Sequence, residues 1–189
     1  VSNGLTLDDH VEIQKTLKEL FEVHLTISIG FGESPFEANL KAYDGRKNNV
    51  ILNEEHNIFG FIDDQSELNV SIMHLDVNDL KSQRKDNSPY EISVKIFDLY
   101  LKIAKYFIQK NSLTFFMGGD NYMVVASNDA KNSVQIFIDI IKNNYNISLN
   151  CGIGNARTSR DAVKLATKSL DTIREIRDSG KPKPDVYEL

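Results

Sequence analysis

Two aspartates stand at positions where apolar packing gives them no role. Asp76 lies toward the carboxyl end of the strand-like stretch Val70–Leu80, which ends in acidic and amide residues. Asp120 lies between two further strand-like runs, Leu113–Met117 and Tyr122–Ala126. Two converging carboxylates offer the hard oxygen ligands that Mg²⁺ needs when a polyphosphate supplies the rest. Without a metal they repel, and the pKa of one of them rises. These residues indicate a metal–nucleotide site if the three runs are neighbours in one sheet.

The residues between the second and third runs predict a tight hairpin. Gly118 and Gly119 give the chain the backbone freedom that such a turn needs, and they let a bulky ligand approach the backbone. Side chains alternate along a strand, so Asp76 shares one face of its strand with His74. An ordinary hairpin whose Asp120 only faces solvent is the alternative interpretation. The acidic end of the first strand argues against it.

The polar residues around Asp76 are further candidates. The turn of Val77, Asn78, Asp79 and Leu80 follows the strand, and its backbone N–H groups can hold phosphate oxygens. Asp79 has a second interpretation, as a residue that only caps the turn. His74 is either a general base or a structural histidine that donates to a neighbouring carboxylate.

Two arginines are the cations nearest these motifs in the sequence. Arg157 follows the apolar run that ends in Ile153-Gly154, and its guanidinium can bind an anionic ligand through two nitrogens. Arg174 lies on the last predicted helix, where it is either part of the site or a solvated surface charge. The single Cys151 lies in an apolar run and is interpreted as a small core residue rather than a nucleophile.

The order of strand, Asp-Val-Asn, long helix, strand and Gly-Gly-Asp-Asn resembles the palm-type domain of nucleotidyl cyclases and diguanylate cyclases. A closer resemblance is to the archaeal GTP cyclohydrolase III family, also called GTP cyclohydrolase IIa. Asn121-Tyr122 stands where diguanylate cyclases have Glu-Phe, which argues against a cyclic-dinucleotide synthase. The resemblance rests on the segments 74–78, 115–123, 152–154, 157–158, 165–166 and 170–174.

This resemblance implies an enzyme that hydrolyses GTP. Water would open the imidazole ring of guanine to give a formylamino-pyrimidine ribonucleotide, and the triphosphate would be cleaved to the monophosphate, feeding riboflavin- or deazaflavin-type biosynthesis. The implied cofactors are Mg²⁺, as two ions, and a monovalent cation such as K⁺. The alternatives are a palm-type nucleotidyl cyclase and a regulatory module that binds a nucleotide without catalysis.

The resemblance also assigns roles to residues. The metal ligands would be Asp76, the carbonyl of Val77 and Asp120, and the catalytic residues would be the same two aspartates with His74. The candidate substrate-binding residues are Val77, Asn78, Asp79, Leu80, Gly118, Gly119, Asn121 and Arg157.

Composition bounds the class of protein. The 189 residues carry a formal net charge of −5, which argues against nucleic-acid binding. No apolar run reaches the length of a membrane span, and one cysteine suits a reducing, cytoplasmic compartment. We therefore expect no nucleic-acid or membrane partner, and the resemblance implies GTP as a small-molecule substrate and a homo-oligomer, either a dimer or a tetramer.

An internal repeat divides the chain. Leu25–Ala38 resembles Leu149–Ala162 at an offset of 124 residues, and each copy contains a strand ending in Ile-Gly followed by a capped helix. The expected organisation is the C-terminal half of a first palm-like repeat over 1–45, with its front half missing. A linker over 46–67 and a second, complete palm-like domain over 68–189 follow.

The order of the predicted strands and helices predicts an α+β, ferredoxin-like fold, an antiparallel sheet with helices on one face, and the resemblance implies tandem palm-type domains of this kind. The bare face would carry His74, Asp76 and Phe116, and a second palm domain would cover it. In the first helix, Leu7–Phe21, we expect the buried side chains to be Val11, Leu17, Leu20 and Phe21. The other predicted helices begin at Ser34-Pro35 and Ser88-Pro89 and span 132–144 and 160–177.

Overall fold

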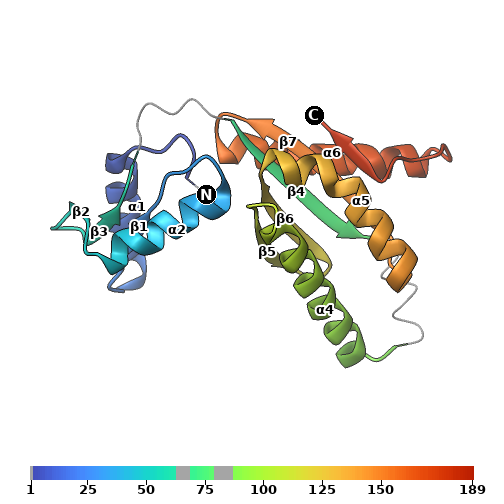
Figure 1. Ribbon diagram of the computed structural model, residues 1–189, viewed down its shortest axis with the longest axis horizontal. Coiled ribbons are helices and arrows are strands. Elements are labelled where there is room, and N and C mark those ends of the chain that lie inside the picture. Colours follow the sequence, from blue (N-terminus) through green and yellow to red (C-terminus); the bar gives the residue numbers. More distant parts are fainter. Residues whose placement is uncertain (1, 63–68, 79–86) are drawn as a thin grey trace. The chain divides into compact units, whose positions relative to one another are not determined.

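The computed structural model describes residues 2–62, 69–78 and 87–189. The chain forms two compact units, Ser2–Leu68 and Asn69–Leu189, and both combine helices with a sheet (Figure 1). The predicted α+β class is confirmed. Within the described ranges, no helix is long and apolar enough to cross a membrane.

The larger unit is built on one five-stranded sheet. In chain order its strands are β4 (Val70–Val77), β5 (Leu113–Gly118), β6 (Asn121–Ala126), β7 (Leu149–Ala156) and β8 (Val186–Glu188). Their spatial order is β5-β6-β4-β7-β8, antiparallel except for the pair β7–β8. The first four strands follow the ferredoxin-like order. The predicted hairpin β5–β6 and its position beside the Asp76 strand are confirmed, whereas β8 was not predicted.

Two helices cover one face of this sheet. α4 (Pro89–Ile108) begins with a capping box between Ser88 and Glu91, as its Ser-Pro-x-Glu sequence predicts. α5 (Asn128–Tyr145) begins four residues earlier than predicted, because Ser127 caps it. Their apolar sides pack with Met73, Leu75 and Val77 into the main core.

The third helix, α6 (Ser159–Asp178), covers the face that we expected to be bare. Ile72 packs there against Ala162 and Ala166 (Figure 1). A Cβ atom at Gly152 or Gly154 would collide with the α6 backbone, so the two glycines let helix and strand approach closely. This face is therefore covered, at least over β4 and β7, by a helix of the same unit.

Phe116 does not lie on that face. It pairs with Tyr122, which stands opposite Leu75 on the core side of the sheet. Its ring is 5.6 Å from that of Phe97 and 6.2 Å from that of Tyr100, both on α4. The prediction is wrong because strand register decides the face, and register cannot be read from one strand alone.

The smaller unit has the order α1 (Leu7–Phe21), β1 (Ile27–Ile29), α2 (Pro35–Lys47), β2 (Ile51–Asn53) and β3 (Ile58–Gly60). Its sheet has the order β1-β3-β2, with β1 and β3 parallel. The segment 46–67, expected as a linker, thus contributes two of the three strands, β2 and β3.

The internal repeat is visible as one packing arrangement used twice. A Cβ at Gly30 would collide with the α2 backbone at Ala38 and Ala42. A Cβ at Gly154 would collide with the α6 backbone 124 residues further on, at Ala162 and Ala166. Both units therefore place a helix directly on a strand at a glycine.

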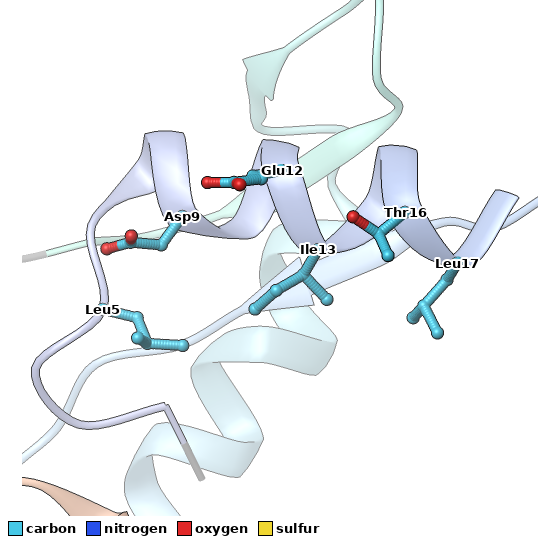
Figure 2. A pocket seen from close by; sticks show the side chains of 6 residues that line it. All are labelled: Leu5, Asp9, Glu12, Ile13, Thr16 and Leu17. Carbon is cyan, nitrogen blue, oxygen red and sulfur yellow. The ribbon is translucent and has the colours of Figure 1, made fainter. Parts of the chain in front are cut away.

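The buried side of α1 differs from the prediction. Leu17, Leu20 and Phe21 are 37%, 69% and 63% exposed, whereas His10 and Gln14 are buried. Figure 2 shows Leu17 pointing to the same side of α1 as Ile13 and Leu5. Within residues 2–62 this side of the helix has no sheet against it, which is why apolar periodicity gave the wrong face.

Candidate functional site

Asp76 lies at the centre of a polar row across the sheet. Its register partners are Asn121 on β6 and Asn150 on β7. Residues directly opposite each other on neighbouring strands share a face, so the three side chains stand side by side. One row further along, His74 pairs with Met123 and Gly152 in the same way. The edge where β4 ends is therefore polar, while the rest of this face is apolar.

Asp120 joins this edge from the β5–β6 turn. Gly118 and Gly119 have φ angles of 100° and 61°, values that favour glycine, and they bring the turn residue next to the end of β4. Nothing lies within 4 Å of a Cβ built on either glycine, so the turn is open to a ligand. The structure thus brings Asp76 and Asp120 together as the sequence predicts.

Burial raises the pKa of Asp76 above its usual value. Arg174, through its hydrogen bond and its charge, acts in the opposite direction, and the charge of Asp120 raises this pKa further. His74 has a smaller lowering effect. The mutual repulsion expected of two carboxylates is therefore present, and a bound cation would relieve it.

Arg174 is part of the site rather than a solvated surface charge. One of its terminal nitrogens lies 3.1 Å from Oδ2 of Asp76, and the other lies 2.9 Å from Oδ1 of Asp171. The close approach of α6 to β7 at Gly152 and Gly154 brings this helix over the end of β4. The Asp76 side chain is only 14% exposed, so the pair is half-buried.

His74 is held by the hairpin. Its Nε2 lies 3.0 Å from the side-chain oxygen of Asn121, whose amide nitrogen donates to Oδ1 of Asp120 at 3.3 Å. With the amide oriented in this way, Nε2 carries the proton and donates. The buried Nδ1 has no hydrogen-bond partner among the described residues. His74 thus orients Asp120 through Asn121, which favours its structural interpretation.

Val77 and Asn78 differ in what their backbones can offer. The N–H of Asn78 donates to the carbonyl of Ser148 at 2.8 Å, toward β7. Backbone groups alternate in direction along a strand, so the carbonyl of Val77 points to the other side, past the start of β6. That carbonyl is placed to serve as a ligand. The N–H of Asn78 is already used and does not fit the predicted phosphate-binding role. Asp79 and Leu80 lie outside the described residues.

Lys183 is a neighbour of the site that sequence reasoning missed. Its ammonium donates to Oδ1 of Asn150 at 2.6 Å and to Asp185 at 3.2 Å. Asn150 in turn exchanges side-chain amide hydrogen bonds with Asn78. No motif marks Lys183 in the sequence, because only the pairing of β8 with β7 brings this segment beside Asn150.

Arg157 does not join the site. It follows β7, whose last residue, Ala156, pairs with Val70 at the opposite end of β4. Six residues of strand separate Val70 from Asp76, a distance of roughly 20 Å. The prediction rested on the position of Arg157 after the apolar run that ends in Ile153-Gly154. In this antiparallel pair, it is the beginning of β7 that lies beside Asp76.

The donors at this edge fit a hard divalent cation. They are two carboxylates and one carbonyl, the oxygen ligands that Mg²⁺ accepts while keeping several waters or phosphate oxygens. Across the described parts of the chain, no group of three or more His, Cys, Asp and Glu side chains is arranged to hold a metal. Two carboxylates and one carbonyl would make up only part of a coordination shell, and a phosphorylated ligand would have to supply the remainder.

The hollow shown in Figure 2, on the smaller unit, lacks these features. Its lining residues are Leu5, Asp9, Glu12, Ile13, Thr16 and Leu17, with no lysine or arginine among them. Asp9 already accepts hydrogen bonds from the backbone and side chain of Thr6 in the capping box of α1. An anionic ligand has no counter-charge there.

Comparison with known proteins identifies the family. Residues 1–184 match the family model described as GTP cyclohydrolase III. The chain belongs to the GTP cyclohydrolase III family. This is a family of enzymes, and the resemblance seen in the sequence is confirmed.

Curated members of the GTP cyclohydrolase III family align with most of the chain. The relative from Methanosphaera stadtmanae is 27% identical over 92% of this chain and 70% of its own length. The one from Methanothermobacter thermautotrophicus is 29% identical, over 92% and 71%. The chain thus spans about 70% of the length of these GTP cyclohydrolase III proteins.

Solved structures confirm the palm-type fold expected of a GTP cyclohydrolase III chain. The GGDEF domain of YfiN from Pseudomonas aeruginosa has a TM-score of 0.53 at 13% identity, over 65% of this chain and 83% of that one. The GGDEF domain of DgcB from Caulobacter crescentus, solved in complex with c-di-GMP, has a TM-score of 0.50 at 8% identity, over 85% and 95%. At such identities the likeness concerns the fold alone.

Proposed function

We propose that this protein hydrolyses GTP as a GTP cyclohydrolase. Water opens the imidazole ring of guanine, and the triphosphate is cleaved, leaving a formylamino-pyrimidine ribonucleotide monophosphate and phosphate. The observation that carries the proposal is the meeting of Asp76 and Asp120 at the open edge of a palm-type sheet, in a chain that matches the family model over residues 1–184. Such a product would enter riboflavin- or deazaflavin-type biosynthesis.

Some residues at this edge would bind the metal ion, and others would orient the metal ligands. Asp76, Asp120 and the carbonyl of Val77 would hold Mg²⁺, as one or two ions. A bound Mg²⁺ neutralises phosphate charge and supplies an activated water. Asn121 transmits the orientation of His74 to Asp120 through the two hydrogen bonds described above. A monovalent cation such as K⁺ is a further proposed cofactor.

Product analysis after incubation with GTP and Mg²⁺ tests this function. We expect loss of purine absorbance, a formyl proton in the NMR spectrum and release of phosphate. A cyclic nucleotide with pyrophosphate would instead support a nucleotidyl cyclase, and unchanged GTP that nevertheless binds would support a regulatory module. Either outcome would overturn the proposal. Omission of Mg²⁺ is the control for metal dependence.

A comparison of GTP with ATP tests the choice of base. A site that hydrogen-bonds the guanine edge rejects adenine by orders of magnitude, because its polar groups would be left unpaired. Comparable turnover of both nucleotides would point to a general triphosphatase.

We also propose that the protein is a homo-oligomer. β5 is an edge strand, and Phe115 and Met117 on it are 44% and 56% exposed. Exposed apolar edge strands are templates for pairing between chains. Light scattering coupled to size-exclusion chromatography should give a dimer or tetramer, and a monomeric mass at micromolar concentration would contradict this.

A further inference from the structure

Arg174 divides its guanidinium between two carboxylates that come from different elements. Asp171 lies one turn earlier on α6 and is 53% exposed, whereas Asp76 on β4 is 14% exposed. The planar fork of arginine allows both bonds at once. One end of the fork is therefore anchored on its own helix, and the other reaches into the candidate metal site.

This contact competes with a metal ion for Asp76. Arg174 takes up Oδ2 of Asp76, and a positive charge beside this carboxylate repels an incoming divalent cation. Near the two aspartates the guanidinium already supplies part of the charge that a cation would supply. A metal ion entering alone must overcome this charge, whereas a triphosphate brings negative charge that the same guanidinium can bind.

We propose that Arg174 makes divalent-cation binding at Asp76 depend on the nucleotide. With the site empty, Arg174 holds Asp76; when the triphosphate arrives, the guanidinium turns to the phosphates, still anchored by Asp171, and Asp76 becomes available to the metal. Arg174 is a positioning residue in this scheme. The inference rests on the proposed role of Asp76 as a metal ligand and adds an order of events to it.

The neighbouring Arg177 provides a matched control. It lies on the same helix and pairs with Asp178 at 2.9 Å, but both side chains are more than half exposed, at 51% and 67%. Ion pairs of this kind contribute little, and the partner of Arg177 lies on its own helix rather than on β4. Replacing Arg177 removes one positive charge from α6 without touching Asp76.

Titration with Mn²⁺, followed by the EPR signal of the free ion, tests the proposal without a measurement of turnover. In the wild-type protein, a non-hydrolysable GTP analogue with an imido bridge should tighten Mn²⁺ binding strongly. Arg174→Met should bind Mn²⁺ alone roughly tenfold more tightly than wild type and should gain much less from the analogue, within the usual range of coupling between sites. Arg174→Lys keeps the charge but not the fork, so it should fall between wild type and Arg174→Met, whereas Arg177→Met should remain close to wild type. Circular dichroism checks that each variant is folded.

Two results separate the failure of this inference from the failure of the site. If Asp76→Asn abolishes Mn²⁺ binding but Arg174→Met binds the metal as weakly as wild type, or more weakly, the role of Arg174 is wrong and the site stands. If Asp76→Asn leaves Mn²⁺ binding unchanged, the metal site is wrong and the role of Arg174 falls with it.

Discussion

The pKa of Asp76 is subject to opposing effects. Burial and the charge of Asp120 raise this pKa, whereas Arg174 and His74 lower it. The net effect is a rise. In the folded protein Asp76 therefore holds its proton more tightly than in the unfolded chain. The ionised carboxylate costs stability above the folded-state pKa, and this cost disappears below the unfolded-state value. The metal-free protein should thus lose stability from this group as pH rises through that window.

Asp76→Asn should accordingly raise the free energy of unfolding of the metal-free protein at pH 7. The gain should shrink toward zero on acidification to about pH 3, where wild-type Asp76 is protonated as well. Urea denaturation in the presence of a chelator, at pH 7 and at acid pH, measures both differences. A variant less stable than wild type at pH 7 would show that the Arg174 contact outweighs the burial of charge.

Removal of either carboxylate should also abolish metal-dependent turnover. Asp76→Asn and Asp120→Asn each delete an anionic ligand, and we expect activity to fall by at least about 100-fold at ordinary Mg²⁺ concentrations. Asp139→Asn, on the exposed side of α5, is the control and should keep full activity. Near wild-type turnover by either site variant would exclude the two-aspartate site.

Among the helices and strands, α6 has the largest influence on the surroundings of Asp76. It carries Arg174 and Asp171, and it reaches the sheet because two glycines on β7 leave room for its backbone. Alanine at Gly154 would place a methyl group against the carbonyl of Ala162, so the helix must move outward.

Gly154→Ala should therefore destabilise the protein by about 1–3 kcal/mol, the usual cost of overpacking. It should also weaken the Arg174–Asp76 contact. Lys168→Ala, on the exposed side of α6, should change stability by less than about 0.5 kcal/mol. Chemical denaturation of the two variants measures the difference, and equal stabilities would mean that the helix is free to shift at no cost.

The sequence predicted most helices and strands of the larger unit, because capping boxes, glycines and apolar periodicity are local signals. It also placed Asp76 and Asp120 correctly, since the hairpin and the strand alternation were both readable. It missed the positions of Arg157 and Lys183, which depend on the direction of β7 and on the pairing of β8. Strand direction and strand pairing depend on residues far apart in the sequence, so no local sequence pattern predicts them.

For the whole molecule, the division into two units raises the question of whether the larger unit folds without the smaller one. Both apolar clusters of the larger unit consist entirely of residues between 70 and 186. A polypeptide of Asn69–Leu189 should therefore fold by itself and melt in one cooperative transition. Thermal unfolding followed by circular dichroism, with NMR shift dispersion as a check on packing, tests this. A broad transition with collapsed dispersion would mean that the core needs more of the chain.

β4 carries main-core residues on one face and the candidate site residues His74 and Asp76 on the other, alternating residue by residue from Met73 to Val77. The same strand register therefore places the core residues on one face and the candidate site residues on the other. An insertion or deletion of a single residue inside this strand would turn Asp76 toward the apolar interior and Leu75 toward the ligand, damaging both at once. Over evolutionary time the loops around β4 can lengthen or shorten, but the strand itself can change only by substitution.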